Sequence, residues 1–129
     1  MEKLQKLADP QYVQFISFAP DEELRFLYSN AKALIFPQIE DFGLVAAEAQ
    51  MCGLPVLAFD RGGGREIVEA GKTGFFFREQ TPEAIMRAVR DFNGLELNRH
   101  YIAKRAQKFS KDEFKRQIIS VVRQSGFKI

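Results

Sequence analysis

Short apolar runs alternate with amphipathic stretches along most of this chain. Each apolar run is nearly continuous, and a stretch with the spacing of a helix follows it. Continuous runs are typical of strands buried on both faces, and strands separated by helices are typical of a parallel sheet. The pattern predicts about four strands, at residues 12–18, 33–36, 56–59 and 74–77. It predicts helices at residues 2–8, 22–30, 43–52, 65–70, 83–92, 97–108 and 111–124.

Residues typical of helix ends mark several of these boundaries. Asp21, Thr81 and Ser110 each stand where a side chain can cap the helix that follows. Gly53 stands at the position of a C′ glycine after the helix at 43–52. We therefore predict one α/β domain, residues 1–129, with a parallel sheet covered by helices on both faces.

Composition excludes several classes of protein. The 129 residues are 46% hydrophobic and 28% charged, which is globular composition, and the net charge of +2 gives no reason to expect a nucleic-acid partner. No apolar run approaches the length of a membrane span, and the N-terminus has no hydrophobic signal region. The single cysteine excludes an intramolecular disulfide. We expect a cytoplasmic protein, or one that reaches the inner membrane surface through partners.

Two carboxylates, Glu40 and Glu48, stand eight positions apart around the predicted start of a helix. Glu40 follows the strand at 33–36, and parallel sheets bind ligands beyond the carboxyl ends of their strands. Free N–H groups at the helix start lie between the two carboxylates and suit a phosphate. Gly43 has no side chain and permits a ligand to approach closely. This arrangement suits an anionic ligand that also carries hydroxyls, such as a sugar nucleotide.

Each carboxylate also has a plainer interpretation. Glu48 lies on the apolar stripe of its helix, where a carboxylate is costly to bury without partners, so it either accepts two vicinal hydroxyls of a ribose or bonds nearby backbone. The other members of this stripe are Leu44, Val45, Ala49 and Cys52. Glu40 and Asp41 either contact sugar hydroxyls or are solvated loop acids that cap the helix.

A second strand-to-helix turn holds three glycines, Gly62 to Gly64. It could form an anion-binding nest, with Arg61 and Arg65 adding positive charge. It lacks the spacing of a P-loop or of a dinucleotide fingerprint. His100 lies in a polar helix and has a surface role, and no Cys/His set has metal-ligand spacing.

Taken in order, these segments resemble the second, donor-binding domain of the retaining group 1 glycosyltransferases, which have two facing Rossmann-like domains. The stretch from Glu40 to Glu48 is similar to the family's pair of glutamates with seven residues between them. The resemblance covers roughly residues 12–92, and the variant Glu-Asp-Phe-Gly looks most like mannosyltransferases of surface-polysaccharide assembly. The matching segments are residues 12–24, 33–37, 40–48, 52–58, 62–68 and 71–77.

The resemblance implies a role for each candidate residue. Glu48 would hold the donor ribose, and Glu40 would hold the transferred sugar as the catalytic residue. The remaining donor-binding residues would be Asp41, with the backbone of Phe42, Gly43 and Leu44 at the sugar and diphosphate, and Phe18 and Ala19 at the nucleobase.

The implied reaction transfers a hexose, with mannose as one candidate, from a nucleoside diphosphate sugar. The acceptor would be a hydroxyl of a glycan or lipid-linked sugar, and the configuration would be retained. No metal or other cofactor is expected, because basic groups and helix dipoles would neutralise the leaving diphosphate.

The chain also departs from the family pattern. It has no acceptor domain before residue 1, and it lacks the first two strands of the donor domain and the Arg and Lys that follow the first of them. We therefore expect no efficient transfer by this chain alone. The strands at 12–18 and 33–36 would each lose a neighbour, and such open edges tend to pair. The edges could pair with each other, with a second copy, or with a separate chain that carries the N-terminal half.

Two alternative functions remain open at this point. One is a non-catalytic module for sugar-nucleotide binding or subunit assembly, which the absent basic pair favours. The other is a different enzyme with the same two-domain arrangement, such as a sugar-nucleotide epimerase. The spacing of Glu40 and Glu48 argues against the epimerase.

Overall fold

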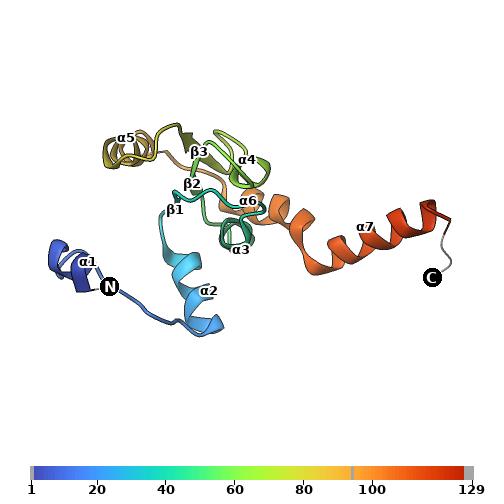
Figure 1. The fold of residues 1–129 in the computed structure, drawn as a ribbon, viewed down its shortest axis with the longest axis horizontal. Helices are drawn as coiled ribbons and strands as arrows, with labels where there is room; N and C mark the ends of the chain where they lie inside the picture. The colour runs from blue at the N-terminus through green and yellow to red at the C-terminus, as the bar shows by residue number, and fades with distance from the viewer. Residues whose placement is uncertain (1, 94, 127–129) are drawn as a thin grey trace.

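The computed structural model describes residues 2–93 and 95–126 and shows an α/β fold (Figure 1). Its strands are β1 (Leu34–Phe36), β2 (Val56–Phe59) and β3 (Gly74–Phe77). Its helices are α1 (Glu2–Leu7), α2 (Asp21–Asn30), α3 (Leu44–Met51), α4 (Gly64–Ile67), α5 (Pro82–Phe92), α6 (Arg99–Ala106) and α7 (Lys111–Gln124), with a 3₁₀ turn at Gln107–Phe109.

The three strands form one parallel sheet in the order β1-β2-β3. Leu34 aligns with Val56, and Val56 aligns with Gly74, so the carboxyl ends of all three strands lie at one edge. The central strand β2 is buried at every position, as its uninterrupted apolar sequence predicts. The predicted fold class is confirmed.

Helices cover both faces of the sheet. On one face, α3 and α4 pack on alternate residues of β1 and β2 and enclose the larger part of the core. On the other face, α5 packs through Ala84 and Ala88 against Phe59 and Phe77. The α5 helix covers β2 and β3 but leaves Ile35 of β1 44% exposed. Helices thus cover both faces of the sheet at β2, whereas one face of β1 is left exposed.

The predicted strand at residues 12–18 is wrong. These residues are irregular and pair with no strand of the described chain, and the side chains of Val13, Phe15 and Ile16 are exposed. A strand is stable only when its N–H and C=O groups find a neighbour, and local apolar sequence cannot supply one. In this structure residues 12–18 and the open edge of β1 do not pair with each other.

Most of the helix ends that the sequence predicts are confirmed. The hydroxyl of Thr81 accepts from the N–H of Ala84 at 3.2 Å, and the hydroxyl of Ser110 accepts from the N–H of Glu113 at 3.3 Å. Gly53 follows α3 with φ +75°, as expected of a C′ glycine. Asp21 differs, because it is the first residue of α2 and the N-cap position is occupied by Pro20, which has no side-chain capping bond.

The α6 helix forms hydrogen bonds to two segments that are distant from it in the sequence, and the first is the end of α2. The Arg99 guanidinium donates to the carbonyls of Tyr28, Ser29 and Ala31 at 3.0, 2.8 and 2.9 Å. Tyr28 and Ser29 lie in the last turn of α2, and Ala31 is its C-cap residue. Since α2 has no fully buried residue, these bonds are a large part of what holds it in place.

A second arginine of α6 fixes the loop before β3. Arg105 bonds the carbonyl of Ile67 at 2.6 Å and pairs with the carboxylate of Glu69 at 3.0 Å. Hydrogen bonds from Lys72 and Tyr101 hold the pKa of Glu69 below its usual value. The α6 helix therefore connects the end of α2 to the loop that precedes β3.

Replacing Arg99 with Ala should loosen α2. Three carbonyls lose a charged donor, and hydrogen bonds to charged groups are worth roughly 1.5–3 kcal/mol. Because the site is only partly buried, we expect a loss of about 2 kcal/mol in the free energy of unfolding. Urea denaturation measures that loss, and hydrogen–deuterium exchange should show faster exchange in α2 than in β2. Arg90→Ala on α5 is the matched control, and equal α2 exchange in both variants would contradict the assigned role.

Candidate functional site

The loop between β1 and α3 lies at the carboxyl edge of the sheet and carries Glu40. The side-chain amide of Gln38 donates to the Glu40 carboxylate at 3.1 Å, and the Glu40 carbonyl accepts from the N–H of Gly63 at 2.7 Å. Gln80, which follows β3, donates to the carbonyl of Pro37 at 2.6 Å. The Glu40 loop is thus bonded both to the turn after β2 and to the segment after β3.

The start of α3 is open to a ligand. Gly43 is the N-cap residue, with φ +83°, and no side chain caps this end of the helix. The first helical bond runs from the N–H of Ala47 to the carbonyl of Gly43, at 3.1 Å. The N–H groups of the first turn therefore have no capping side chain, and the helix dipole makes this end attractive to an anion.

The glycine turn at residues 62–64 supports the Glu40 loop. A Cβ atom on Gly63 would lie 2.2 Å from the carbonyl oxygen of Phe42, so only glycine permits this approach. The Gly63 N–H is already bonded to Glu40, so it is not available to an anion-binding nest. The turn is primarily a support for the loop.

Basic side chains gather at the same edge of the sheet. Asp60, which follows β2, pairs with Arg65 at 3.1 Å and with Arg78 at 3.9 Å. Arg61, Arg65 and Arg78 are all exposed. Arg78 was not among the predicted residues, although its position directly after β3 is a usable signal.

Glu48 and the larger members of its stripe face outward, which corrects the expectation that the stripe would meet the core, although Ala49 of the same stripe is buried. The residues of α3 that face the core are Ala46, Ala47, Ala49 and Gln50, whereas Leu44, Val45 and Glu48 are exposed. Small alanines let the helix lie close to the sheet, and the larger side chains turn away. The carboxylate of Glu48 is therefore solvent-accessible.

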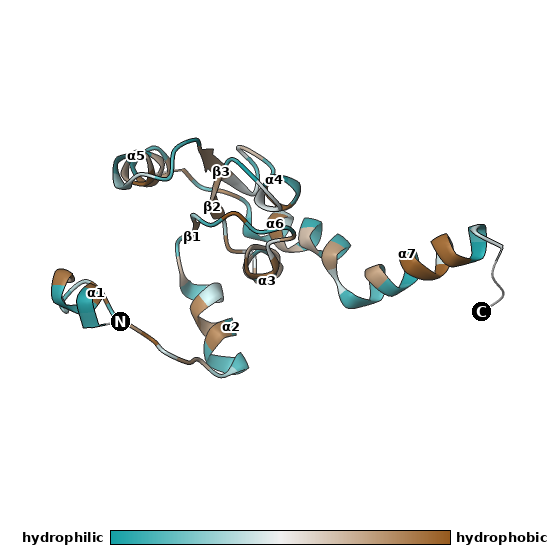
Figure 2. Cartoon of the chain, in the orientation of Figure 1, coloured by the Kyte–Doolittle hydropathy of each residue, from teal (hydrophilic) through white to brown (hydrophobic). Residues whose placement is uncertain are grey.

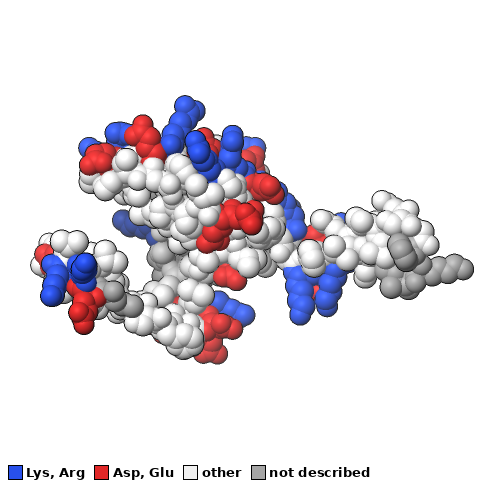
Figure 3. Space-filling model, in the orientation of Figure 1, with Lys and Arg blue, Asp and Glu red and all other residues white. Residues whose placement is uncertain are grey.

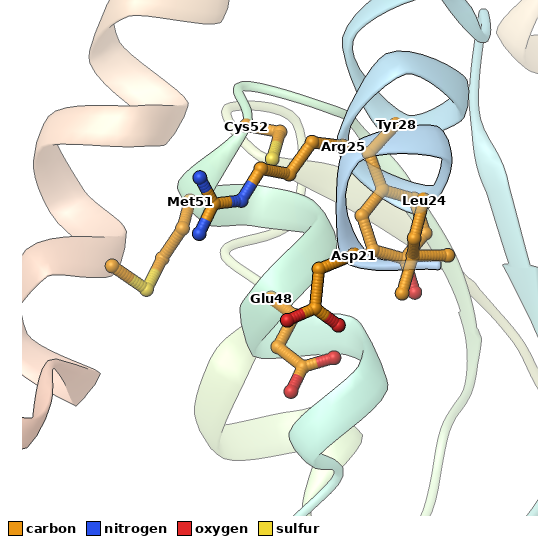
Figure 4. A pocket seen from close by; sticks show the side chains of 7 residues that line it. All are labelled: Asp21, Leu24, Arg25, Tyr28, Glu48, Met51 and Cys52. Atoms are coloured by element: carbon orange, nitrogen blue, oxygen red, sulfur yellow. The ribbon is translucent and has the colours of Figure 1, made fainter. Parts of the chain in front are cut away.

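Glu48 lines a pocket of about 400 Å³ between α2 and α3 (Figure 4). The close-up shows the carboxylates of Asp21 and Glu48 toward one end and the Arg25 side chain reaching toward Met51. The lining residues are Asp21, Leu24, Arg25, Tyr28, Glu48, Met51 and Cys52.

Tyr28 supplies a polar group on the α2 side of this pocket. Burial raises the pKa of its hydroxyl, and the nearby Glu48 carboxylate raises it further. The hydroxyl is thus protonated at neutral pH and can donate a hydrogen bond. The α2 wall was not predicted as part of the site, although Leu24 and Tyr28 share one face of that helix by spacing.

The predicted site residues do not all meet in one cavity. Phe42 and Leu44 line a separate groove beside α7, and Glu40 and Asp41 lie in the loop before α3. Phe18 is 81% exposed, and Ala19 lies two residues before Asp21 of the α2–α3 pocket. The nucleobase role of Phe18 and Ala19 stays a prediction.

Residues 2–93 and 95–126 contain no group of three or more His, Cys, Asp or Glu that could hold a metal ion. Among the same residues, no helix has both the length and the apolar character needed to span a membrane.

Comparison with known proteins identifies the family. A family model described as "Glycosyl transferases group 1" matches residues 2–109. The chain belongs to the group 1 glycosyltransferases. It is 42% identical over 96 residues to a D-inositol 3-phosphate glycosyltransferase of Streptomyces avermitilis, which covers 70% of this chain and 21% of that protein. It is also 33% identical over 113 residues to the α-1,3/1,6-mannosyltransferase ALG2 of Rhizomucor pusillus, covering 83% of this chain and 24% of that protein.

The fold is likewise that of a known glycosyltransferase structure. A sucrose-phosphate synthase of Thermosynechococcus elongatus superposes with a TM-score of 0.79 and 27% identity, covering 95% of this chain and 32% of that chain. The chain therefore spans between about a fifth and a third of the length of these glycosyltransferases.

Replacing Gly63 with Ala should displace the Glu40 loop. The added methyl group would clash with the Phe42 carbonyl, so we expect a loss of roughly 1–3 kcal/mol in the free energy of unfolding, as for other overpacked sites. Urea denaturation measures this loss. In Gly71→Ala, nothing lies within 4 Å of the new Cβ and only backbone strain at φ +78° opposes it. Binding of a nucleoside diphosphate sugar should weaken in Gly63→Ala alone, and equal binding by the two variants would contradict the loop's role.

Proposed function

We propose that this chain is the donor-binding part of a group 1 glycosyltransferase and binds a nucleoside diphosphate sugar at the carboxyl edge of its sheet. The main support is the placement of Glu48. Its accessible carboxylate lies in a pocket on α3, and the uncapped start of that same helix follows the Glu40 loop. A carboxylate accepts vicinal hydroxyls, and a free helix start suits phosphate.

In this proposal the two glutamates take different parts of the donor. Glu48 accepts the two hydroxyls of the ribose, with the Tyr28 hydroxyl beside it as a donor. Glu40 accepts hydroxyls of the transferred sugar and is the catalytic residue. The amide of Gln38 orients the Glu40 carboxylate through the 3.1 Å hydrogen bond.

The diphosphate lies at the start of α3 in the same proposal. Backbone N–H groups of Phe42, Gly43 and Leu44 face it, and Asp41 borders the sugar. Developing negative charge on the leaving diphosphate is neutralised by the helix dipole and by guanidinium groups at this edge, for which Arg61 and Arg78 are candidates. No metal ion is required in this scheme.

The proposed reaction is hexose transfer with retained configuration. The bond from the anomeric carbon to the diphosphate breaks, and a new bond forms to the oxygen of an acceptor hydroxyl, whose proton passes to the leaving diphosphate. The acceptor is a glycan or a lipid-linked sugar. The 33% identity to a mannosyltransferase supports mannose as the hexose.

A second candidate is a non-catalytic module that binds sugar nucleotides or assembles with another subunit. The open edge of β1 and its exposed Ile35 favour this function. The two candidates differ in one measurement, the release of nucleoside diphosphate in the presence of an acceptor glycan. The measurement uses this chain mixed with a separate N-terminal half, because no efficient transfer is expected of the chain alone. Release above background then supports the transferase, and donor binding without release supports the module.

Replacing either glutamate with Gln should separate their roles. Glu48→Gln should weaken binding of both a nucleoside diphosphate sugar and the free nucleoside diphosphate, by roughly tenfold to a hundredfold, because a charged hydrogen-bond acceptor is lost. Glu40→Gln should weaken binding of the sugar nucleotide while leaving the free nucleotide nearly unchanged. Calorimetric titration with GDP-, UDP- and ADP-sugars measures both effects.

The exposed Glu96→Gln variant is the control for these titrations, since it removes the same charge away from the site. Equal affinities in all three variants would show that the donor does not bind here.

A partner strand at the β1 edge is a further expectation of this proposal. We propose that the edge pairs either with a second copy or with a separate chain carrying an N-terminal half. Sedimentation of the chain alone, and of the chain mixed with such a half, measures the assembly. Ile35→Lys should weaken it, because a charge on the uncovered face opposes burial. A monomer mass at every concentration, with and without the other half, would contradict both forms of pairing.

A further inference from the structure

The pocket between α2 and α3 contains charged side chains of both signs. Asp21 and Arg25 line it from α2, and Glu48 lines it from α3. The close-up shows the two carboxylates toward one end, whereas the Arg25 side chain reaches toward Met51 (Figure 4). Figure 3 shows acidic and basic side chains together over α2. The pocket therefore offers hydrogen-bond acceptors at one end and a guanidinium donor apart from them.

The charged groups of this pocket do not pair with one another. Asp21 and Arg25 are four residues apart on one helix, a spacing at which an acidic and a basic side chain commonly form an ion pair. Within residues 2–93 and 95–126, however, Asp21, Arg25 and Glu48 take part in no ion pair and no side-chain hydrogen bond. Their hydrogen-bonding capacity is thus not used by the described chain.

Apolar side chains complete the pocket. Leu24 lines it from α2, and Met51 and Cys52 line it from α3. Figure 2 shows hydrophobic residues on both of these helices. A thioether makes favourable contacts with an aromatic ring. The volume of about 400 Å³ is typical of a small-molecule site. The pocket therefore suits a flat ring whose edges carry both donors and acceptors.

We propose that this pocket binds the nucleobase of the donor and selects guanine, with Arg25 and Asp21 as the residues that determine the specificity. The inference rests on the proposed function, because that function places the ribose beside this ring, at Glu48. Guanine carries two neighbouring acceptors, O6 and N7, and an arginine guanidinium donates to both. Its adjoining edge carries two neighbouring donors, the N1–H and the N2 amino group, which suit the two oxygens of a carboxylate.

Adenine and uracil match these two side chains less well. Adenine has an amino group in place of O6, so the guanidinium would meet a donor. Uracil has a single N–H between its two carbonyl groups, so the carboxylate would gain one donor instead of two. A good bidentate contact discriminates against the wrong base by roughly fivefold to a hundredfold. Only guanine gives two partners to both Arg25 and Asp21.

Calorimetric titration with GDP, UDP and ADP tests the selection of guanine. The chain should bind GDP about tenfold or more tightly than UDP or ADP. Arg25→Gln and Asp21→Asn should each reduce this preference, and the combined variant should bind the three nucleotides equally well. Arg123→Gln is the control, since it removes the same charge from α7 and should leave the preference unchanged.

Two analogues of GDP assign each contact to an atom. The 7-deaza analogue lacks the N7 acceptor, and inosine diphosphate lacks the N2 amino group. The unmodified chain should bind the 7-deaza analogue several-fold more weakly than GDP, and Arg25→Gln should bind the two equally. Inosine diphosphate should show the same relation with Asp21→Asn. A loss of affinity that persists in the matched variant would assign the contact to another residue and contradict the proposal.

The outcomes separate this inference from the proposed function. Equal binding of GDP, UDP and ADP, with all three weakened by Glu48→Gln, would overturn the selection of guanine and leave donor binding intact. A preference for UDP or ADP, or a GDP preference that survives in the combined variant, would also overturn it. Absence of binding by all three nucleotides would overturn both the selection of guanine and the proposed donor site.

Discussion

The close packing of α3 against β1 and β2 is the contact on which the candidate site depends. Three alanines of α3 are essentially without solvent exposure, and Phe36, Val56 and Ala58 lie opposite them. Such small side chains leave little room between helix and sheet, and loss of a methyl group or addition of one at such an interface is costly. Because the small residues face inward, Glu48 and its larger neighbours must face outward. The pocket on the α2 side and the open start of the helix are both consequences of this one orientation.

The same packing accounts for the contacts of the glycine turn at residues 62–64. With α3 held tightly on the sheet, the loop before it runs over residues 62–64, and the Gly63 N–H bonds the Glu40 carbonyl. A glycine-rich turn at the end of a parallel strand is often interpreted as a phosphate site. Here the N–H of Gly63 is already bonded to the Glu40 carbonyl, whereas the start of α3 after Gly43 has no capping side chain. Two similar turns at one edge of a sheet thus differ in whether their N–H groups already have partners in the chain.

The elements that the sequence predicts correctly are those that find the strands or N–H groups they bond to within this same chain. The strands β2 and β3, and the caps at Thr81 and Ser110, depend on local sequence and on neighbours within the chain. Residues 12–18 have equally suitable sequence for a strand but join no strand of the sheet in the described chain, so the prediction was wrong there. The direction of the Glu48 stripe was also mistaken, because alanine is compatible with either face of a helix and periodicity alone does not decide which face packs.

Long-range contacts account for what sequence reasoning missed in the site. The α2 wall of the Glu48 pocket is held by Arg99, about seventy residues further along the chain, through carbonyls that any sequence would present. Every residue has a backbone carbonyl, so the sequence does not reveal which carbonyls an arginine will bond. The contact between Arg99 and the Tyr28 carbonyl therefore could not be predicted. The arrangement has a functional consequence, because α2 is attached to the rest of the chain mainly at its C-terminal end. Its N-terminal end holds Asp21, which lines the pocket with Glu48, and follows the exposed Phe18, so a ligand that bridges Glu48 and this segment would add contacts at that end of α2.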